Sequence, residues 1–271
     1  MYTISIVLSL LTTIFITYTN NTELSLKVVM LSLLYFAIFV ILYIALIFII
    51  AFICSSFINK NKPIKKASKF YNFIFNIINS FLCKTANIKV VVKNKEILKK
   101  DKQYVIVCNH KSRFDPMIIS NELRKVLKIA FISKQENFDI PIVGGVIHKC
   151  GYIGIDREHP KNALNSVNQA VDFIENNKKY SYGVFPEGTR NKGDDLMPFK
   201  NGCLKIAQKS KKPICIITLT NTADIHKNFP FKRTYVTMDI VDIIEPEIFD
   251  EHTTTEVGNI IREKMINSLK K

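Results

Sequence analysis

The first long hydrophobic stretch of the chain covers residues 28–58, VVMLSLLYFAIFVILYIALIFIIAFICSSFI, and contains no charged side chain. As a helix this stretch would be roughly 46 Å long, which exceeds the roughly 30 Å of bilayer hydrocarbon. A helix buried in a soluble protein is rarely apolar on every side over such a length. The pattern therefore predicts a transmembrane helix that is tilted or extends beyond one interface.

A second uncharged stretch, Met1 to Tyr18, is shorter and is diluted by Thr and Ser. A signal peptide would begin with a basic segment and end at small residues, and the TYTNNTEL sequence at the end of this stretch offers no such cleavage site. We interpret it as a marginal first span, with a peripheral or re-entrant helix as the alternative. Residues 1–59 are thus expected to form a membrane anchor of one or two transmembrane helices.

Residues 60–87 combine lysines with a regular polar stripe. Its positions are spaced by four, three, four and three residues: Lys65, Lys69, Asn72, Asn76 and Asn79. This spacing predicts a helix with apolar side chains around most of its circumference. We expect a basic amphipathic helix that lies in the membrane interface or packs on the second span. A buried first helix of the globular domain would give the same pattern and stays the alternative.

From residue 88 the hydrophobic positions form short runs that alternate with helical patterns. The predicted strands are Ile88–Val92, Tyr104–Cys108, Ile129–Ser133, Tyr152–Ile155, Gly183–Phe185, Ile214–Thr218 and Tyr235–Ile244. Helices are expected at Pro116–Leu123, from Pro160, after Gly202 and after the TTTEV sequence. This alternation predicts an α/β domain over residues 88–271, with a mixed, largely parallel sheet flanked by helices and preceded by the N-terminal helices.

The net charge of +15 is unevenly distributed along the chain. Residues 60–102 hold twelve lysines against Glu96 and Asp101. A basic chain also fits nucleic-acid binding. Lysines that begin directly after a membrane span, however, more commonly mark its cytoplasmic side and attract anionic lipid headgroups. We therefore expect an integral protein of the cell membrane, with its domain on the cytoplasmic side, Thr19–Lys27 as an external loop, and no nucleic-acid partner.

The six cysteines form no C-x-x-C pair and lie mostly in apolar runs. They are expected to be reduced thiols rather than disulfides or metal ligands.

Candidate chemistry begins with NHKSRFDP, residues 109–116, which follows the apolar run of residues 104–108. His110 would leave a buried strand at its carboxyl end, where ligand sites gather in α/β sheets. Asp115 could orient this histidine as a general base. Asp115 before Pro116 is also a good helix N-cap, so the pair alone does not decide between a turn and a catalytic dyad.

Three further stretches end or form strands in the same region: GYIGIDRE (151–158), VFPEGTRN (184–191) and KKPICIITL (211–219). The first places Arg157 at a strand's carboxyl end, where a guanidinium suits a phosphate. Each stretch also has a simple structural explanation, such as a β-turn for Pro-Glu-Gly-Thr or a surface ion pair for Arg157. Their joint occurrence on successive strand ends favours a functional site.

With these four blocks in this order, residues 104–220 resemble the glycerolipid acyltransferases. The FPEGTR form and the N-terminal anchor look most like bacterial 1-acylglycerol-3-phosphate acyltransferases. One small departure is Asn191, where serine is frequent in relatives.

The resemblance implies a role for each block. His110 would take the proton from the sn-2 hydroxyl of lysophosphatidic acid as that oxygen attacks an acyl thioester, and Asp115 would hold and stabilise the imidazolium. Asn109 or nearby backbone N–H groups would stabilise the oxyanion. The residues expected to bind or shape the acceptor site are Arg113, Lys134, Arg157, Glu187, Gly188, Thr189 and Arg190. His148, His159 and His226 lie outside the blocks and are interpreted as structural or surface residues.

A thioester is already activated, so neither a metal nor a redox cofactor is expected. The acyl donor would be acyl-CoA or acyl carrier protein, and charge does not discriminate between them. Two alternatives remain open: acylation of glycerol-3-phosphate or another lysophospholipid by the same chemistry, and a basic membrane-tethered binding protein without catalysis.

Overall fold

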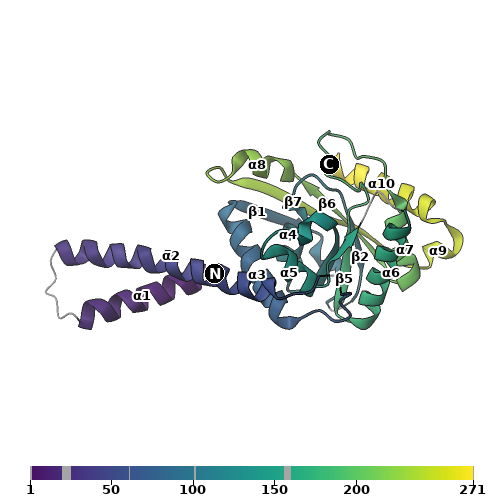
Figure 1. The fold of residues 1–271 in the computed structure, drawn as a ribbon. Coiled ribbons are helices and arrows are strands. Elements are labelled where there is room, and N and C mark those ends of the chain that lie inside the picture. Colours follow the sequence, from purple (N-terminus) through teal and green to yellow (C-terminus); the bar gives the residue numbers. More distant parts are fainter. Residues whose placement is uncertain (1, 20–25, 61, 101, 156–159, 271) are drawn as a thin grey trace.

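A computed structural model describes residues 2–19, 26–60, 62–100, 102–155 and 160–270. Figure 1 shows a hairpin of two helices, α1 (Tyr2–Thr19) and α2 (Leu26–Ser56), that projects from an α/β domain. The further helices described are α3 (Lys69–Thr85), α4 (Asp115–Leu123), α5 (Val143–Lys149), α6 (Pro160–Asn176), α7 (Lys205–Ser210), α8 (Ile225–Asn228), α9 (Ile248–Glu251) and α10 (Thr254–Leu269). Short 3-10 turns are η1 (Lys95–Ile97), η2 (Gln135–Phe138), η3 (Asn201–Leu204) and η4 (Thr222–Asp224).

Several polar residues of α1 lie at its contact with α2. Ser5 and Ser9 are fully buried, the Thr12 hydroxyl lies 3.0 Å from the Tyr43 hydroxyl, and Thr17 lies 3.2 Å from Ser32. Small polar side chains allow two helices to approach closely and to hydrogen-bond where no water competes. Several of the Ser and Thr residues that dilute the first hydrophobic stretch therefore serve the contact between the two helices.

Helix α2 is long and apolar enough to cross a membrane, and most of its side chains are exposed. Its last turn is attached to the domain. Ser55 donates a 3.0 Å hydrogen bond to the carbonyl of Ile142, and a Cβ on Gly145 would lie only 2.2 Å from the Ser55 hydroxyl. Glycine is thus required at position 145 for this close approach of α5 to α2.

The domain is built on a seven-stranded sheet with the order β1-β7-β6-β2-β5-β3-β4. The strands are β1 (Ile88–Lys93), β2 (Val105–Cys108), β3 (Lys128–Lys134), β4 (Ile153–Ile155), β5 (Tyr180–Val184), β6 (Ile214–Thr220) and β7 (Thr234–Ile244). All neighbouring pairs are parallel except β6 and β7, which are antiparallel. Helices α3, α4 and α5 cover one face of the sheet, and α6, α7 and α10 cover the other (Figure 1).

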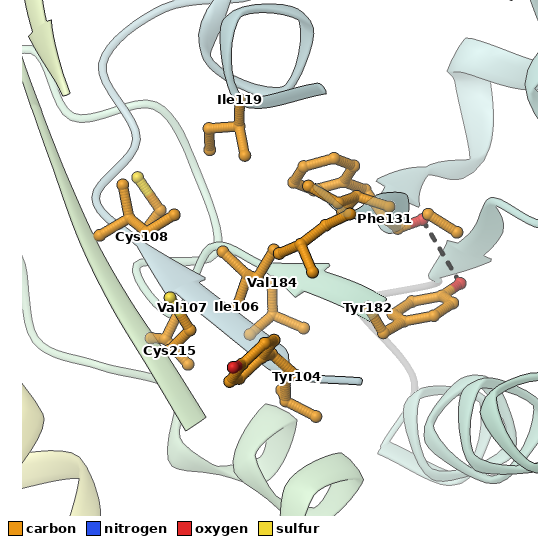
Figure 2. Close-up of a cluster of buried hydrophobic side chains, with 14 of the residues drawn as sticks. Tyr104, Ile106, Val107, Cys108, Ile119, Phe131, Tyr182, Val184 and Cys215 are labelled. Carbon is orange, nitrogen blue, oxygen red and sulfur yellow. Dashed lines mark hydrogen bonds between the residues drawn. The ribbon is translucent and has the colours of Figure 1, made fainter. Parts of the chain in front are cut away.

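The centre of the sheet is the hydrophobic core. Residues 105–108 of β2 are fully buried between β5 and β6, as expected for a parallel strand that helices cover on both faces. Figure 2 shows Ile106 and Val107 within this core, together with the hydrogen bond from the Tyr182 hydroxyl to the carbonyl of Phe131. The expected fold class is therefore confirmed. Strand β5 begins three residues before its predicted start at Gly183.

Helix α3 begins at Lys69, after its N-cap Ser68, and packs against the domain. Its Ile74 and Asn79 are buried, and the Asn79 amide donates to the carbonyl of Met117. Phe73 faces outward, while Phe81 contacts Phe48 of α2 at a ring distance of 5.9 Å. The helix thus covers the domain and touches the second apolar helix, and its location in a membrane interface stays a prediction, as do the boundaries at residues 59 and 87.

Candidate active site

His110 lies two residues beyond β2, at the carboxyl end of the central strand. Its Nδ1 is 2.8 Å from Oδ2 of Asp115, whose side chain is fully buried. The same carboxylate oxygen accepts hydrogen bonds from the backbone N–H groups of Lys111 (2.7 Å) and Ser112 (2.8 Å). The sequence NHKSRFDP thus folds into a turn that closes around one carboxylate oxygen.

This arrangement answers the question of whether Asp115 is only a helix cap. The N-cap position of α4 is Phe114, and no side chain accepts a hydrogen bond from the first turn. The Asp115 carboxylate instead bonds backward to residues 110–112. The capping interpretation of Asp115 is therefore wrong, and the carboxylate is in position to orient an imidazole.

The pairing also determines which histidine nitrogen is free. In neutral imidazole, Nδ1 is the donor when it faces a carboxylate, which leaves the lone pair on Nε2. The His110 side chain is 16% exposed, so a ligand can reach it while most of the ring is held by protein. The ring stacks on Phe185 at a centroid distance of 4.2 Å, and Phe185 stacks on Phe131.

The loop after β5 holds the backbone of His110 from a second side. Glu187 is 1% exposed, and its Oε1 accepts a 2.7 Å hydrogen bond from the His110 N–H. Oε2 accepts from the Asn191 amide (2.9 Å) and from the Met197 N–H (3.2 Å). The Asn191 N–H in turn donates to the His110 carbonyl at 2.7 Å. Both backbone groups of His110 are thus fixed by the FPEGTRN stretch.

The turn that carries Glu187 requires the glycine that follows it. Gly188 has φ +72°, and its N–H donates to the carbonyl of Phe185. A Cβ at this position would also lie 2.8 Å from Cδ of Lys200. Only glycine adopts this conformation without strain.

The remaining predicted site residues fall into three groups. Asn109 is buried, and both atoms of its amide pair with the backbone of Leu219 on β6, so it joins two strands. Exposed polar residues lie at strand ends or on loops at the same edge of the sheet: Arg113, Lys134, Thr189 and Arg190. Arg157 lies outside the described residues, and so does His159.

Sequence reasoning did not find two residues that support His110. Phe185, which stacks on its ring, and Asn191, which bonds its carbonyl, both belong to the same short stretch as Glu187. The signal in the sequence was Asn191 itself, which stands where serine is frequent in relatives. Its longer amide side chain donates hydrogen bonds to Glu187 and to the Asp195 carbonyl.

Two other groups near the sheet are poor candidates for chemistry. Burial raises the pKa of the Cys108 thiol well above its usual range, so this cysteine stays protonated and is a weak nucleophile. His148 is buried against Phe138, and burial together with the nearby Lys149 lowers its pKa. His226 is exposed on α8. Among the described residues, no three His, Cys, Asp or Glu side chains gather as a possible metal site.

With this geometry established, the class of protein follows from comparison with known families. Residues 89–220 match the family model described as Acyltransferase, so this part of the chain is an acyltransferase domain. The match includes all four blocks and the whole of the arrangement around His110.

The particular relatives carry one name. The chain is 29% identical over 186 residues to a 1-acyl-sn-glycerol-3-phosphate acyltransferase of Borreliella burgdorferi, covering 68% of this chain and 73% of the relative. It is 34% identical over 129 residues to the protein of that name from Helicobacter pylori, covering 47% and 53%. The crystal structure of the 1-acyl-sn-glycerophosphate (LPA) acyltransferase PlsC from Thermotoga maritima superimposes with a TM-score of 0.62 at 21% identity, covering 100% of this chain and 97% of that one. This last similarity concerns the fold alone and agrees with the arrangement of helices and strands described above.

Proposed function

We propose that the protein transfers a fatty acyl group from an acyl thioester to the sn-2 hydroxyl of lysophosphatidic acid, which gives phosphatidic acid. The observation that carries this proposal is the His110–Asp115 pair at the end of β2, held by Glu187 within an acyltransferase domain. The names of the curated relatives support the choice of acceptor.

In the proposed reaction, Nε2 of His110 accepts the proton of the sn-2 hydroxyl while the oxygen attacks the thioester carbonyl. Asp115 stabilises the imidazolium through Nδ1. The tetrahedral intermediate then collapses, the C–S bond breaks, and the imidazolium returns its proton to the departing thiolate. The acceptor alcohol is itself the nucleophile, so no enzyme serine is needed, and the activated thioester requires neither metal nor redox cofactor.

Binding of the acceptor phosphate is assigned to Arg113, Lys134, Thr189 and Arg190 at this edge of the sheet. The GYIGIDRE block adds Arg157, which lies outside the described residues. Glu187 and Gly188 shape the loop that presents Thr189 and Arg190. Because the Asn109 amide is already paired with Leu219, we favour backbone N–H groups over Asn109 for the oxyanion.

The proposed setting is the cytoplasmic surface of the cell membrane, with α2 spanning the bilayer. Support comes from the length and apolar character of α2 and from the lysines that follow it. A lipid acceptor would then present its headgroup at the level of the domain. Acyl-CoA and acyl carrier protein are both candidate donors.

Acyl transfer by the purified full chain in lipid vesicles tests this function. Lysophosphatidic acid, glycerol-3-phosphate and another lysophospholipid would each be offered with acyl-CoA and with acyl carrier protein, and free thiol would be measured. We expect thiol release with lysophosphatidic acid and its near-complete loss in His110→Ala. His252→Ala, at the opposite end of the sheet, is the matched control. Preference for another acceptor would overturn the assigned substrate, and an active His110→Ala would overturn the mechanism.

A further inference from the structure

The chain between α8 and β7 exposes aromatic side chains beside cations. These residues, 229–233 with the sequence FPFKR, are called the basic aromatic loop below. Phe231 is 94% exposed and Phe229 is 51% exposed, and Tyr235 at the start of β7 is 57% exposed. A single exposed apolar side chain is normal, but neighbouring exposed apolar side chains rimmed by polar residues mark protein or membrane interaction sites.

Hydrogen bonds hold this loop in place. The N–H of Lys232 donates to the carbonyl of Asn228, and the N–H of Thr234 donates to the carbonyl of Asn87 at the start of β1. The Arg233 guanidinium donates to the Asn87 side chain at 3.1 Å. The backbone therefore presents Phe231 outward in a defined conformation.

The strand register places the loop at the active-site edge of the sheet. Cys108, the last residue of β2, lies opposite Ile217 of β6, and Thr220 of β6 lies opposite Thr237 of β7. The loop precedes β7, so it extends beyond the edge at which His110 leaves the sheet. Figure 1 shows it on the side of the domain from which the α1–α2 hairpin projects.

The charges around the loop are positive. Lys232 and Arg233 belong to it, and Lys89 on β1 places its ammonium 5.9 Å from the ring centre of Tyr235. Asp224, the acidic residue that precedes the loop on η4, already pairs with Lys227. Aromatic rings beside Lys and Arg suit the headgroup region of an anionic bilayer, where the rings enter the interface and the cations meet phosphate.

We infer that the basic aromatic loop is a second membrane contact, separate from the helical hairpin, that holds the active-site edge of the domain against anionic lipid. This inference rests on the proposed membrane setting of α2. Two separated contacts fix the orientation of the domain on the membrane. With the hairpin alone, only the joint between α2 and the domain would set this orientation. His110 would then face the depth at which a lipid acceptor lies.

Tryptophan fluorescence tests this contact directly, because the chain contains no tryptophan. Phe231→Trp introduces one at the loop tip, and Glu247→Trp introduces one at an exposed position beyond the other end of β7. That strand has eleven residues and is roughly 33 Å long, so the two sites lie beyond opposite ends of it. Each full-length variant would be reconstituted into phosphatidylglycerol vesicles that contain lipids with brominated acyl chains, and co-flotation would verify anchoring.

We expect blue-shifted, bromine-quenched emission for Phe231→Trp and unquenched emission for Glu247→Trp. Replacing phosphatidylglycerol with a zwitterionic lipid, or adding Lys232→Gln, should weaken the quenching, with about a fivefold change in the docking equilibrium per lost cation. Emission of Phe231→Trp as unquenched as that of the control, in protein that floats with vesicles, would overturn the inference. Quenching that does not depend on lipid charge would overturn the proposed role of Lys232 and Arg233 in binding anionic lipid.

Acyl transfer measured on the same vesicles separates this inference from the proposed function. Acyl transfer without quenching would refute the loop contact and leave the enzyme assignment intact. Quenching without acyl transfer to any acceptor would refute the assigned reaction and support the membrane contact.

Discussion

Replacing Glu187 with glutamine changes the side chain little in size but removes one of its two acceptor oxygens. All three groups that bond this carboxylate are donors: the N–H of His110 on Oε1, and the amide of Asn191 and the N–H of Met197 on Oε2. A glutamine amide must therefore turn its NH2 group toward at least one buried donor. No rotation of the side chain restores all of the bonds.

The amide orientation with the smaller free-energy cost directs its NH2 group at the single donor, the His110 N–H. The other two hydrogen bonds, from Asn191 and Met197, are then kept. One unmet buried donor costs about 1–3 kcal/mol, which should appear as a loss of folding stability. The repulsion also displaces the backbone that carries the imidazole. A misplacement of about 1 Å at a reacting group lowers the rate roughly 100-fold, equivalent to about 2.7 kcal/mol in the barrier.

Steady-state kinetics of acyl transfer on vesicles and thermal unfolding of the same preparation would measure both effects. We expect kcat to fall roughly 100-fold with little change in KM, because the carboxylate is buried and its hydrogen bonds go to protein groups. Glu263→Gln, an exposed position on α10, is the matched control. An unchanged kcat with a raised KM would refute this reasoning and would mean that Glu187 contacts the acceptor itself.

Three further substitutions probe the same structure. Asp115→Asn should leave the chain folded and vesicle-bound but lower kcat about 10³- to 10⁴-fold, because the amide carries no charge to stabilise an imidazolium; near-normal turnover would contradict the assigned role. Gly188→Ala should lower the unfolding temperature by a few degrees, since a Cβ at φ +72° is strained and meets Lys200; a neutral result would show that the loop relaxes. His148 has a pKa below the usual value of 6.5, so the unfolded chain gains a proton that the folded protein lacks, and stability should fall as the pH drops below about 6.5. His148→Gln should flatten that decline between about pH 7.5 and about pH 5.5 in thermal scans, and an unchanged slope would assign the decline to other groups.

Local patterns predicted the elements that depend on local causes. The buried strands β2 and β6 are runs of apolar residues bounded by polar ones, and their positions follow from the sequence. His110 and Asp115 are five residues apart in one turn, so their contact needs only a short chain reversal. The order of the strands has no such local cause. Nothing in the periodicity of β7 indicates that it would lie between β1 and β6, parallel to one and antiparallel to the other.

The same limit applies to side chains whose partners are distant in sequence. Glu187 was expected at the acceptor site because it belongs to a recognisable block, yet its carboxylate is buried against a backbone group 77 residues away. Asn79 was counted with the polar stripe of its helix, and it is buried with a hydrogen bond to Met117. An amphipathic pattern predicts which helix face a polar residue lies on. The group with which that residue forms a hydrogen bond is seen only in the folded structure.

Gly145 affects how the α/β domain is attached to α2. A side chain there would overlap Ser55, so α5 packs directly against the last turn of α2. Through this direct contact, a vertical displacement of α2 is passed on to the domain. In the proposed membrane setting, a thinner or thicker bilayer would raise or lower α2 and carry His110 with it. Bilayer thickness would thereby tune how often the imidazole meets a lipid hydroxyl, independently of any change in the active site itself.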